Sequence, residues 1–170
     1  MLSILRALDD AAVDYVVVGG VAVVLRGHAR MTVDLDLALD LTAENATAVL
    51  EVLIGCGLRP RLPVPARDFA DAELRGQWVE QRHLIAFTMH DPDDALREVD
   101  LLATSPIPYA DLAADADRFT IEGVTVPVAS LAHLLAMKRH AGRPQDLADI
   151  AALSALQRPP MVDGDDRDRA

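Results

Sequence analysis

The chain has 170 residues with 51% hydrophobic and 25% charged side chains, a composition typical of one globular domain with a real core. No apolar run reaches the roughly 18 residues of a membrane span, and no signal-peptide pattern is present, so we expect a cytoplasmic protein without membrane contact. The single Cys56 excludes an internal disulfide and a multi-thiolate metal site, and the formal net charge of −11 argues against a surface covered with phosphate-binding residues.

The N-terminal part of the chain predicts a helix, a strand and a glycine turn. Ser3 is placed to cap a first helix, and the apolar run at residues 15–18 predicts a buried strand. Gly19 and Gly20 follow at once. Paired glycines suit a tight strand-to-helix turn, and they leave no side chain between the backbone and an approaching ligand. A short helix is expected over residues 21–25.

Strict alternation marks the next strand. Because neighbouring strand residues point to opposite faces, one face carries Asp34 and Asp36, and the other carries Val33, Leu35, Leu37 and Leu39. Two like charges this close are costly unless a cation compensates them, and Mg²⁺ takes oxygen ligands. The alternative is that both carboxylates lie on the solvated face of an edge strand.

The middle of the chain alternates helix and strand, which is typical of α/β units. Thr42 is placed to cap a helix that ends near Gly55. Residues 68–74 predict a helical turn or two. Residues 76–80 match no single pattern, although Trp78 is expected to pack into the core.

Two further strands are expected at residues 84–89 and 95–102. The second of these contains Asp100. If it lies beside the strand of Asp34 and Asp36, Asp100 completes a cluster of three carboxylates.

The C-terminal part predicts a hairpin over residues 119–128 with a Glu-Gly turn. Ser130 caps a following helix that ends at Gly142, and Pro144 is well placed in the first turn of the last helix. We expect that last helix, residues 145–156, to bury Leu147, Ile150, Ala151 and Leu153 or their neighbours. Residues 1–157 are predicted to form a single domain, and residues 158–170 a disordered tail.

These motifs together resemble those of a known family. The segments are Gly19-Gly20-Val-Ala, Gly27-x-x-Arg30-x-Thr32-x-Asp34-Leu-Asp36-Leu37, Val99-Asp100-Leu-Leu and Leu135-x-Met-Lys138-x-x-x-Gly142-Arg143-x-x-Asp146-Leu-x-Asp149-Ile. They resemble a nucleotidyltransferase of the DNA-polymerase-beta type, and the last block is typical of the minimal bacterial branch that includes AbiEii-type toxins. The matched motifs span most of residues 15–153.

The resemblance implies an α+β nucleotidyltransferase fold, with a mixed β-sheet, helices packed mainly on one side, and C-terminal helices. It also implies catalytic, metal-binding carboxylates. Asp34 and Asp36 would hold two Mg²⁺ ions, and Asp100 would help to bind the metal and activate the acceptor hydroxyl. Two metal ions can stabilise the attacking and leaving oxygens of an in-line displacement.

The nucleotide-binding residues that the resemblance implies are Gly19, Gly20, Arg30, Lys138 and Asp146. The two glycines would let backbone N–H groups approach the triphosphate. Lys138 would lie near the phosphates, with Asp146 as its orienting partner. A solvated surface role is the alternative for Lys138 and for Arg30, as it is for the neighbouring Arg26 and His28.

One departure concerns the phosphate contact. Many relatives carry a hydroxyl residue after the first or second glycine, where this chain has Gly20 and Val21. That contact must therefore come from elsewhere in the chain.

The leading hypothesis is an enzyme that moves a nucleoside monophosphate from an NTP to an RNA acceptor such as tRNA, or to a protein, as part of a toxin–antitoxin pair with a cognate antitoxin. A second hypothesis is a small-molecule adenylyltransferase of the aminoglycoside-modifying kind. A third is a degenerate module that binds a nucleotide or a partner without turnover; the missing hydroxyl and the acidic surface motivate it.

Overall fold

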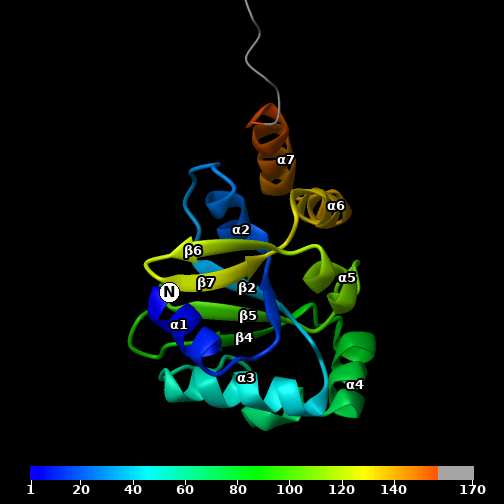
Figure 1. Ribbon diagram of the computed structural model, residues 1–170. Coiled ribbons are helices and arrows are strands. Elements are labelled where there is room, and N and C mark those ends of the chain that lie inside the picture. Colours follow the sequence, from blue (N-terminus) through cyan, green and yellow to red (C-terminus); the bar gives the residue numbers. More distant parts are fainter. Residues whose placement is uncertain (157–170) are drawn as a thin grey trace, which may run out of the picture.

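The computed structural model describes residues 1–156, and the tail predicted for residues 158–170 lies outside these described residues. Helices and strands alternate along the chain (Figure 1). The strands are β1 (Tyr15–Val17), β2 (Asp34–Leu39), β3 (Arg59–Pro60), β4 (Ala86–His90), β5 (Glu98–Leu102), β6 (Asp117–Ile121) and β7 (Val124–Val128). The helices are α1 (Leu2–Asp10), α2 (Gly19–Leu25), α3 (Ala43–Gly55), the 3₁₀ turn η1 (Ala66–Phe69), α4 (Ala72–Arg82), α5 (Tyr109–Ala114), α6 (Leu131–Ala141) and α7 (Pro144–Leu156).

All seven of these strands form one sheet, in the order β3-β4-β5-β2-β1-β7-β6. The sheet is mixed, because β2 runs antiparallel to β1 and parallel to β5. The predicted α+β fold is confirmed. The position of β2 also decides between two interpretations of its carboxylates: β2 lies inside the sheet, so the edge-strand alternative is wrong.

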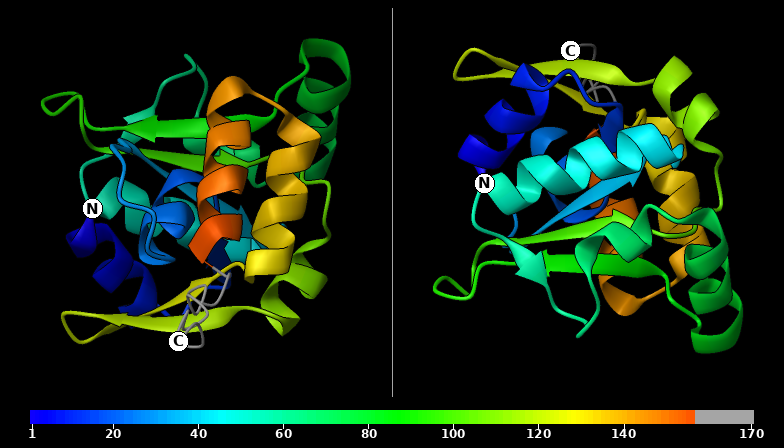
Figure 2. Two further views of the ribbon diagram at one scale, coloured as in Figure 1. Left: turned by 90° about the horizontal axis from the view of Figure 1, so that it is seen from above. Right: turned by 90° about the horizontal axis from the view of Figure 1, so that it is seen from below.

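The two faces of β2 differ as the alternation predicts. Leu35, Leu37 and Leu39 are at most 3% exposed and belong to the main core cluster. Helices α1 and α3 lie over this side of the sheet, whereas α6 and α7 lie on the opposite side (Figure 2). The carboxylates of β2 therefore point away from the α1–α3 layer and toward the side of the C-terminal helices.

Several helix ends lie where the capping and terminating residues of the sequence predict them. The Thr42 hydroxyl accepts from the backbone N–H of Asn45 at the start of α3, and Ser130 accepts from His133 at the start of α6. Gly142, with a φ of 64°, ends α6 in the left-handed conformation that favours glycine. Pro144 is the first residue of α7, and the predicted hairpin of β6 and β7 is present.

Three elements differ from their prediction. Helix α1 begins at Leu2 with Met1 at its N-cap position, so the expected cap at Ser3 is wrong. Helix α4 covers residues 72–82, well beyond the one or two turns expected, because Asp71 caps it and Trp78 anchors it. Trp78 stacks on Phe87 with ring centroids 5.9 Å apart, so its packing role is confirmed. Leu147 and Ala151 are predicted to be buried, but both are exposed, Leu147 to 59%. The buried positions of α7 are Asp146, Asp149 and Leu153.

The turn between β1 and α2 also begins one residue earlier than the paired glycines predict. Strand β1 ends at Val17 and α2 begins at Gly19, so both glycines lie in the first turn of the helix rather than before it. Among the described residues, no helix is both long and apolar enough to cross a membrane.

Candidate active site

Neighbouring strands bring acidic side chains together on the face of the sheet opposite α3. Strands β2 and β5 pair so that Asp36 lies directly opposite Asp100, and Asp34 lies opposite Glu98. Paired residues of adjacent strands have their Cα atoms about 5 Å apart and their side chains on the same face. The juxtaposition of Asp100 with the Asp34–Asp36 strand is therefore confirmed.

A third strand holds Asp100 in place. Thr88 on β4 pairs with Asp100, and its hydroxyl donates a 2.6 Å hydrogen bond to Asp100 Oδ1. This bond orients one oxygen of the Asp100 carboxylate. The role of Thr88 depends on the register of β4 against β5, which the sequence of β4 alone does not specify.

Asp36 has a raised pKa. Burial raises the pKa of Asp36 to about 6. The N–H of Gly20, which donates to Asp36 Oδ2 over 3.3 Å, opposes that rise, while the negative charges of Asp100 and Asp34 add to it. A partly buried carboxylate beside like charges favours an added cation.

The glycine pair is required by what packs against it. A Cβ on Gly19 would lie 1.9 Å from Asp36 Oδ2, and Gly19 also has a φ of 58°. A Cβ on Gly20 would lie 2.3 Å from the hydroxyl of Thr32 and 2.9 Å from a guanidinium nitrogen of Arg30. The glycines thus let the carboxylate approach the backbone of α2 closely. The Thr32 hydroxyl lies beside Gly20, which is one of the positions where many relatives carry a hydroxyl residue.

A cleft of about 600 Å³ opens in front of Asp36. Four of the residues predicted from the sequence line it: Gly19, Asp36, Lys138 and Asp146. The other four, Asp34, Asp100, Gly20 and Arg30, lie outside its lining. Arg143 lines the cleft although it was not predicted as a site residue; its side chain is 75% exposed and its positive charge lowers the pKa of Asp36.

Lys138 is buried rather than solvated. It is 4% exposed, and its Nζ lies 2.7 Å from Asp149 Oδ2 and 3.0 Å from Asp146 Oδ1. The solvated-lysine alternative is therefore wrong, and the predicted contact with Asp146 is present. Burial alone would raise the pKa of Asp146, but hydrogen bonds from Arg143 and Lys138 hold that pKa below its usual range.

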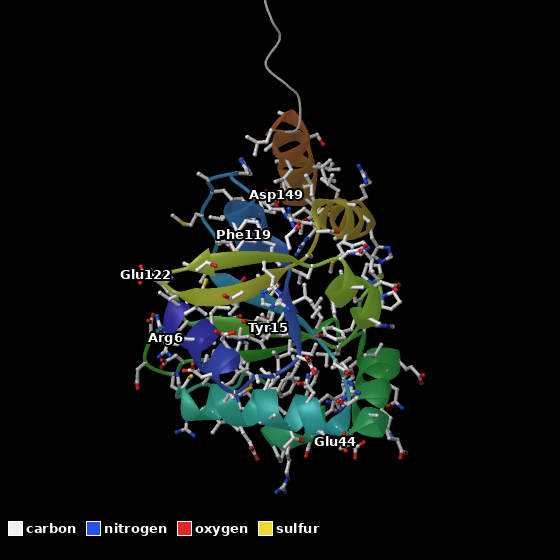
Figure 3. All side chains as sticks on the ribbon, viewed as in Figure 1. Arg6, Tyr15, Glu44, Phe119, Glu122 and Asp149 are labelled. Atoms are coloured by element: carbon white, nitrogen blue, oxygen red, sulfur yellow. The ribbon has the colours of Figure 1, made fainter. Side chains whose placement is uncertain are left out.

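Asp149 joins three segments and was missed as a site residue. It is fully buried in α7 and lies close to α6 and α2 (Figure 3). Besides Lys138, it pairs with Arg30, whose Nε lies 2.8 Å from Asp149 Oδ1. Arg30 therefore ties the α2–β2 connection to α7. The signal that could have identified Asp149 is its spacing of three residues from Asp146, which places both on one face of the helix.

Two other basic residues of that connection differ in role. Arg26 donates to the carbonyl of Ala129, pairs with Asp117 and lies over the ring of Phe119, so it fastens α2 to the β6–β7 hairpin. His28 lies 3.9 Å from Asp149. Neither residue lines the cleft.

Among residues 1–156, no group of three or more His, Cys, Asp and Glu side chains is arranged to hold a metal ion. Asp34 lies two positions along β2 from Asp36, about 7 Å away at the Cα atoms. The predicted three-carboxylate site is thus an in-register pair, Asp36 and Asp100, with Asp34 beside it. The donor chemistry suits a hard cation, because all three groups supply carboxylate oxygens.

A family model described as aminoglycoside-2''-adenylyltransferase matches residues 1–153. The chain belongs to this family. It is accordingly an enzyme of the nucleotidyltransferase class, as the motifs predict. The family match agrees with the small-molecule alternative, and the narrower AbiEii-type branch is not the family that matches.

Solved structures of the family's fold agree with this assignment. The lincosamide antibiotic adenylyltransferase LnuA with lincomycin bound is 19% identical with a TM-score of 0.59, over 91% of this chain and 94% of that one. The antibiotic-resistance factor ANT(2'')-Ia is 13% identical with a TM-score of 0.58, over 91% and 80%. An antigenic nucleotidyltransferase-like protein from Paracoccidioides brasiliensis is 23% identical with a TM-score of 0.53, over 92% and 74%. The comparison with curated proteins finds no match.

Proposed function

We propose that this protein transfers a nucleoside monophosphate from an NTP to a hydroxyl group of a small molecule, with Mg²⁺ as cofactor. The observation that carries the proposal is the in-register pair of Asp36 and Asp100, with Asp36 against the backbone of the Gly19–Gly20 turn. Two partly buried carboxylates on adjacent central strands form a site that favours a divalent cation.

Asp36 and Asp100, with Asp34, are the residues that would hold the metal. When bound, Mg²⁺ supplies charge stabilisation for the attacking and leaving oxygens of the displacement. Asp100 has a second role in the proposal, as the carboxylate beside which the acceptor hydroxyl lies. Its hydrogen bond from Thr88 keeps it in a fixed orientation for that purpose.

The basic side chains of α6 and the α6–α7 turn are proposed to bind the phosphates. Lys138 and Arg143 both line the cleft with Gly19 and Asp36. The N–H of Gly20 already donates to Asp36, so the side-chain cations supply most of the contact to the triphosphate. Asp146 and Asp149 hold Lys138 at the cleft wall, and Arg30, paired with Asp149, supports that arrangement.

A small-molecule acceptor is favoured over RNA for two reasons. The family model that covers residues 1–153 is that of an aminoglycoside adenylyltransferase. The formal net charge of −11 is also unfavourable for a polyanionic acceptor, because nucleic-acid affinity comes mainly from neutralising phosphates with Lys and Arg. Transfer to tRNA or to a protein, as in a toxin–antitoxin system, is the contrasting outcome of the test below.

The test incubates the purified protein with Mg²⁺, each α-labelled NTP in turn, and four acceptors: lincomycin, tobramycin, total tRNA and a cell protein extract. Wild-type protein is expected to label a small molecule, and Asp36→Asn is expected to lose that transfer. Asp10→Asn, an exposed carboxylate at the end of α1, is the matched control. Labelling of only tRNA or protein would replace the proposal with the toxin-like alternative, and no label transfer at all would refute both.

A further inference from the structure

The cleft beside Asp36 has a second half with a different character. Five of its lining residues form an apolar wall, which consists of Ile85, Leu102, Pro106, Leu134 and Met137. Ile85 is 68% exposed and lines the cleft, so its side chain is accessible to a ligand there. An exposed apolar surface in a cleft indicates that a ligand covers it.

The apolar wall continues directly from Asp100. Leu102 lies two positions further along β5 on the same face, about 7 Å from Asp100 at the Cα atoms. Ala86 is paired with Leu102, and Ile85, the residue before Ala86, lines the same cleft as Leu102. The basic residues of the cleft, Lys138 and Arg143, come from α6 and the α6–α7 turn rather than from these strands. A molecule whose hydroxyl lies beside Asp100 would therefore contact Leu102 and Ile85 with the rest of its surface.

The charged residues of the cleft limit how much positive charge that molecule can carry. Its lining carries two carboxylates, Asp36 and Asp146. Asp146 is paired with Lys138 and Arg143, and Asp36 belongs to the proposed cation site. No carboxylate of the lining is left to pair with ammonium groups of a ligand. A polycation would lose hydration in this cleft without gaining partners.

We propose that the apolar wall binds the acceptor, and that the acceptor is a hydroxyl-bearing small molecule with an apolar body and at most one positive charge. This assignment rests on the proposed function. In the transfer, the acceptor oxygen forms a bond to the α-phosphorus and the bond to the bridging oxygen breaks. Pyrophosphate leaves with the electron pair, and the hydroxyl proton goes to the carboxylate of Asp100. Thr104, whose side chain is exposed at the wall, is available to bond a further hydroxyl.

The first arm of the test compares two acceptors with the wild-type protein. Lincomycin has an apolar chain and a single basic amine, whereas tobramycin carries several amines. We expect kcat/KM for lincomycin to exceed that for tobramycin by at least about 100-fold, since each poorly matched group costs roughly tenfold or more. Equal or better use of tobramycin would overturn the assignment.

The second arm introduces a charge into the wall without disturbing the core. Ile85→Glu changes a residue that is 68% exposed, and Leu96→Glu changes one that is 70% exposed in the β4–β5 connection and outside the cleft. Ile85→Glu is expected to raise KM for lincomycin by about tenfold or more and to leave the affinity for Mg²⁺·NTP unchanged. Leu96→Glu is expected to change neither.

The outcomes separate this inference from the proposed function. An unchanged KM in Ile85→Glu, or equal or better use of tobramycin by a protein that transfers label to both antibiotics, overturns the acceptor assignment alone. Transfer to neither antibiotic overturns the proposed small-molecule function with it. Failure of the wild-type protein to bind Mg²⁺·NTP overturns the proposed function as well.

Discussion

Asp36 on β2 and Asp100 on β5 are paired in register on adjacent parallel strands in the interior of the sheet. Their side chains share the face that opens to the cleft, and Thr88 on the next strand fixes the carboxylate of Asp100. The site is thus built on three neighbouring strands rather than on loops, which favours a fixed geometry for the reacting groups.

The first prediction concerns the carboxylate pair. Asp36→Asn and Asp100→Asn each remove a proposed metal ligand, and each is expected to lower kcat by at least about 100-fold, since even supporting groups of metal sites contribute 10–100-fold. Steady-state kinetics with an accepted substrate measures this, with Asp10→Asn as the charge-matched control. Activity within a few-fold of wild type in either variant would contradict the assignment.

Thr88→Val tests the support of Asp100 separately. Valine keeps the shape of threonine but cannot donate the 2.6 Å hydrogen bond to Asp100. We expect kcat to fall by roughly tenfold, with KM for the NTP nearly unchanged because Thr88 lies outside the cleft lining. A variant that changes KM alone would show that Thr88 acts on binding instead.

The raised pKa of Asp36 also predicts a pH dependence of stability. The pKa of Asp36 is 3.8 in an ordinary environment and about 6 in the fold, so between these values the folded protein holds a proton that the unfolded chain releases. The free energy of unfolding of the metal-free protein therefore falls as the pH rises from about 4 to about 6, and it stays lower above that range. The contribution is at most about 3 kcal/mol.

Asp36→Asn carries no such charge. It is therefore expected to be more stable than wild type at pH 8 and similar at pH 4, as measured by urea unfolding with EDTA present. Adding Mg²⁺ should restore stability to the wild-type protein at pH 8 but not to Asp36→Asn. The account is contradicted if the difference between the two proteins does not change with pH.

Gly19→Ala tests the close approach of Asp36 to the backbone. Gly19 and Gly57 both have a positive φ, 58° and 91°, so an alanine is strained at either position. Only at Gly19 would the new Cβ meet another residue, since nothing lies within 4 Å of the Gly57 position. We expect Gly57→Ala to lose about 1 kcal/mol of stability with normal activity, and Gly19→Ala to lose activity as well. Equal activity in the two variants would count against the role of Gly19.

Asp149→Ala tests the buried ion-pair cluster. Removing this carboxylate leaves Lys138 and Arg30 without their shared partner in a buried place, and such a loss costs about 3–5 kcal/mol. Thermal or urea unfolding measures it, with the exposed Asp10→Ala as control. A loss below about 1 kcal/mol, as is usual for surface ion pairs, would show that the cluster contributes little to the fold.

The sequence allowed the central strand and its partner to be predicted because both signals are local. The alternation in β2 assigns Asp34 and Asp36 to one face, and Asp100 falls in a second recognisable strand. The glycine turn, the caps at Thr42 and Ser130 and the end at Gly142 are likewise short-range signals.

What could not be predicted depends on long-range packing. The buried stripe of α7 was assigned from its apolar residues, yet the structure buries Asp146 and Asp149 there because Lys138 on α6 and Arg30 before β2 face them. Carboxylates along one face of a helix are usually exposed to solvent, and only the three-dimensional position of cationic partners shows that they are buried. The same holds for Thr88, whose contact with Asp100 depends on the register of β4.

Calorimetric titration of NTP into the wild-type protein tests the central claim most directly, with and without Mg²⁺ and beside Asp36→Asn and Asp100→Asn. The account predicts that NTP binds wild type only with the divalent cation, and that each variant weakens this binding by roughly tenfold or more. Equal NTP affinity in all three proteins, or full affinity in the presence of EDTA, would contradict it.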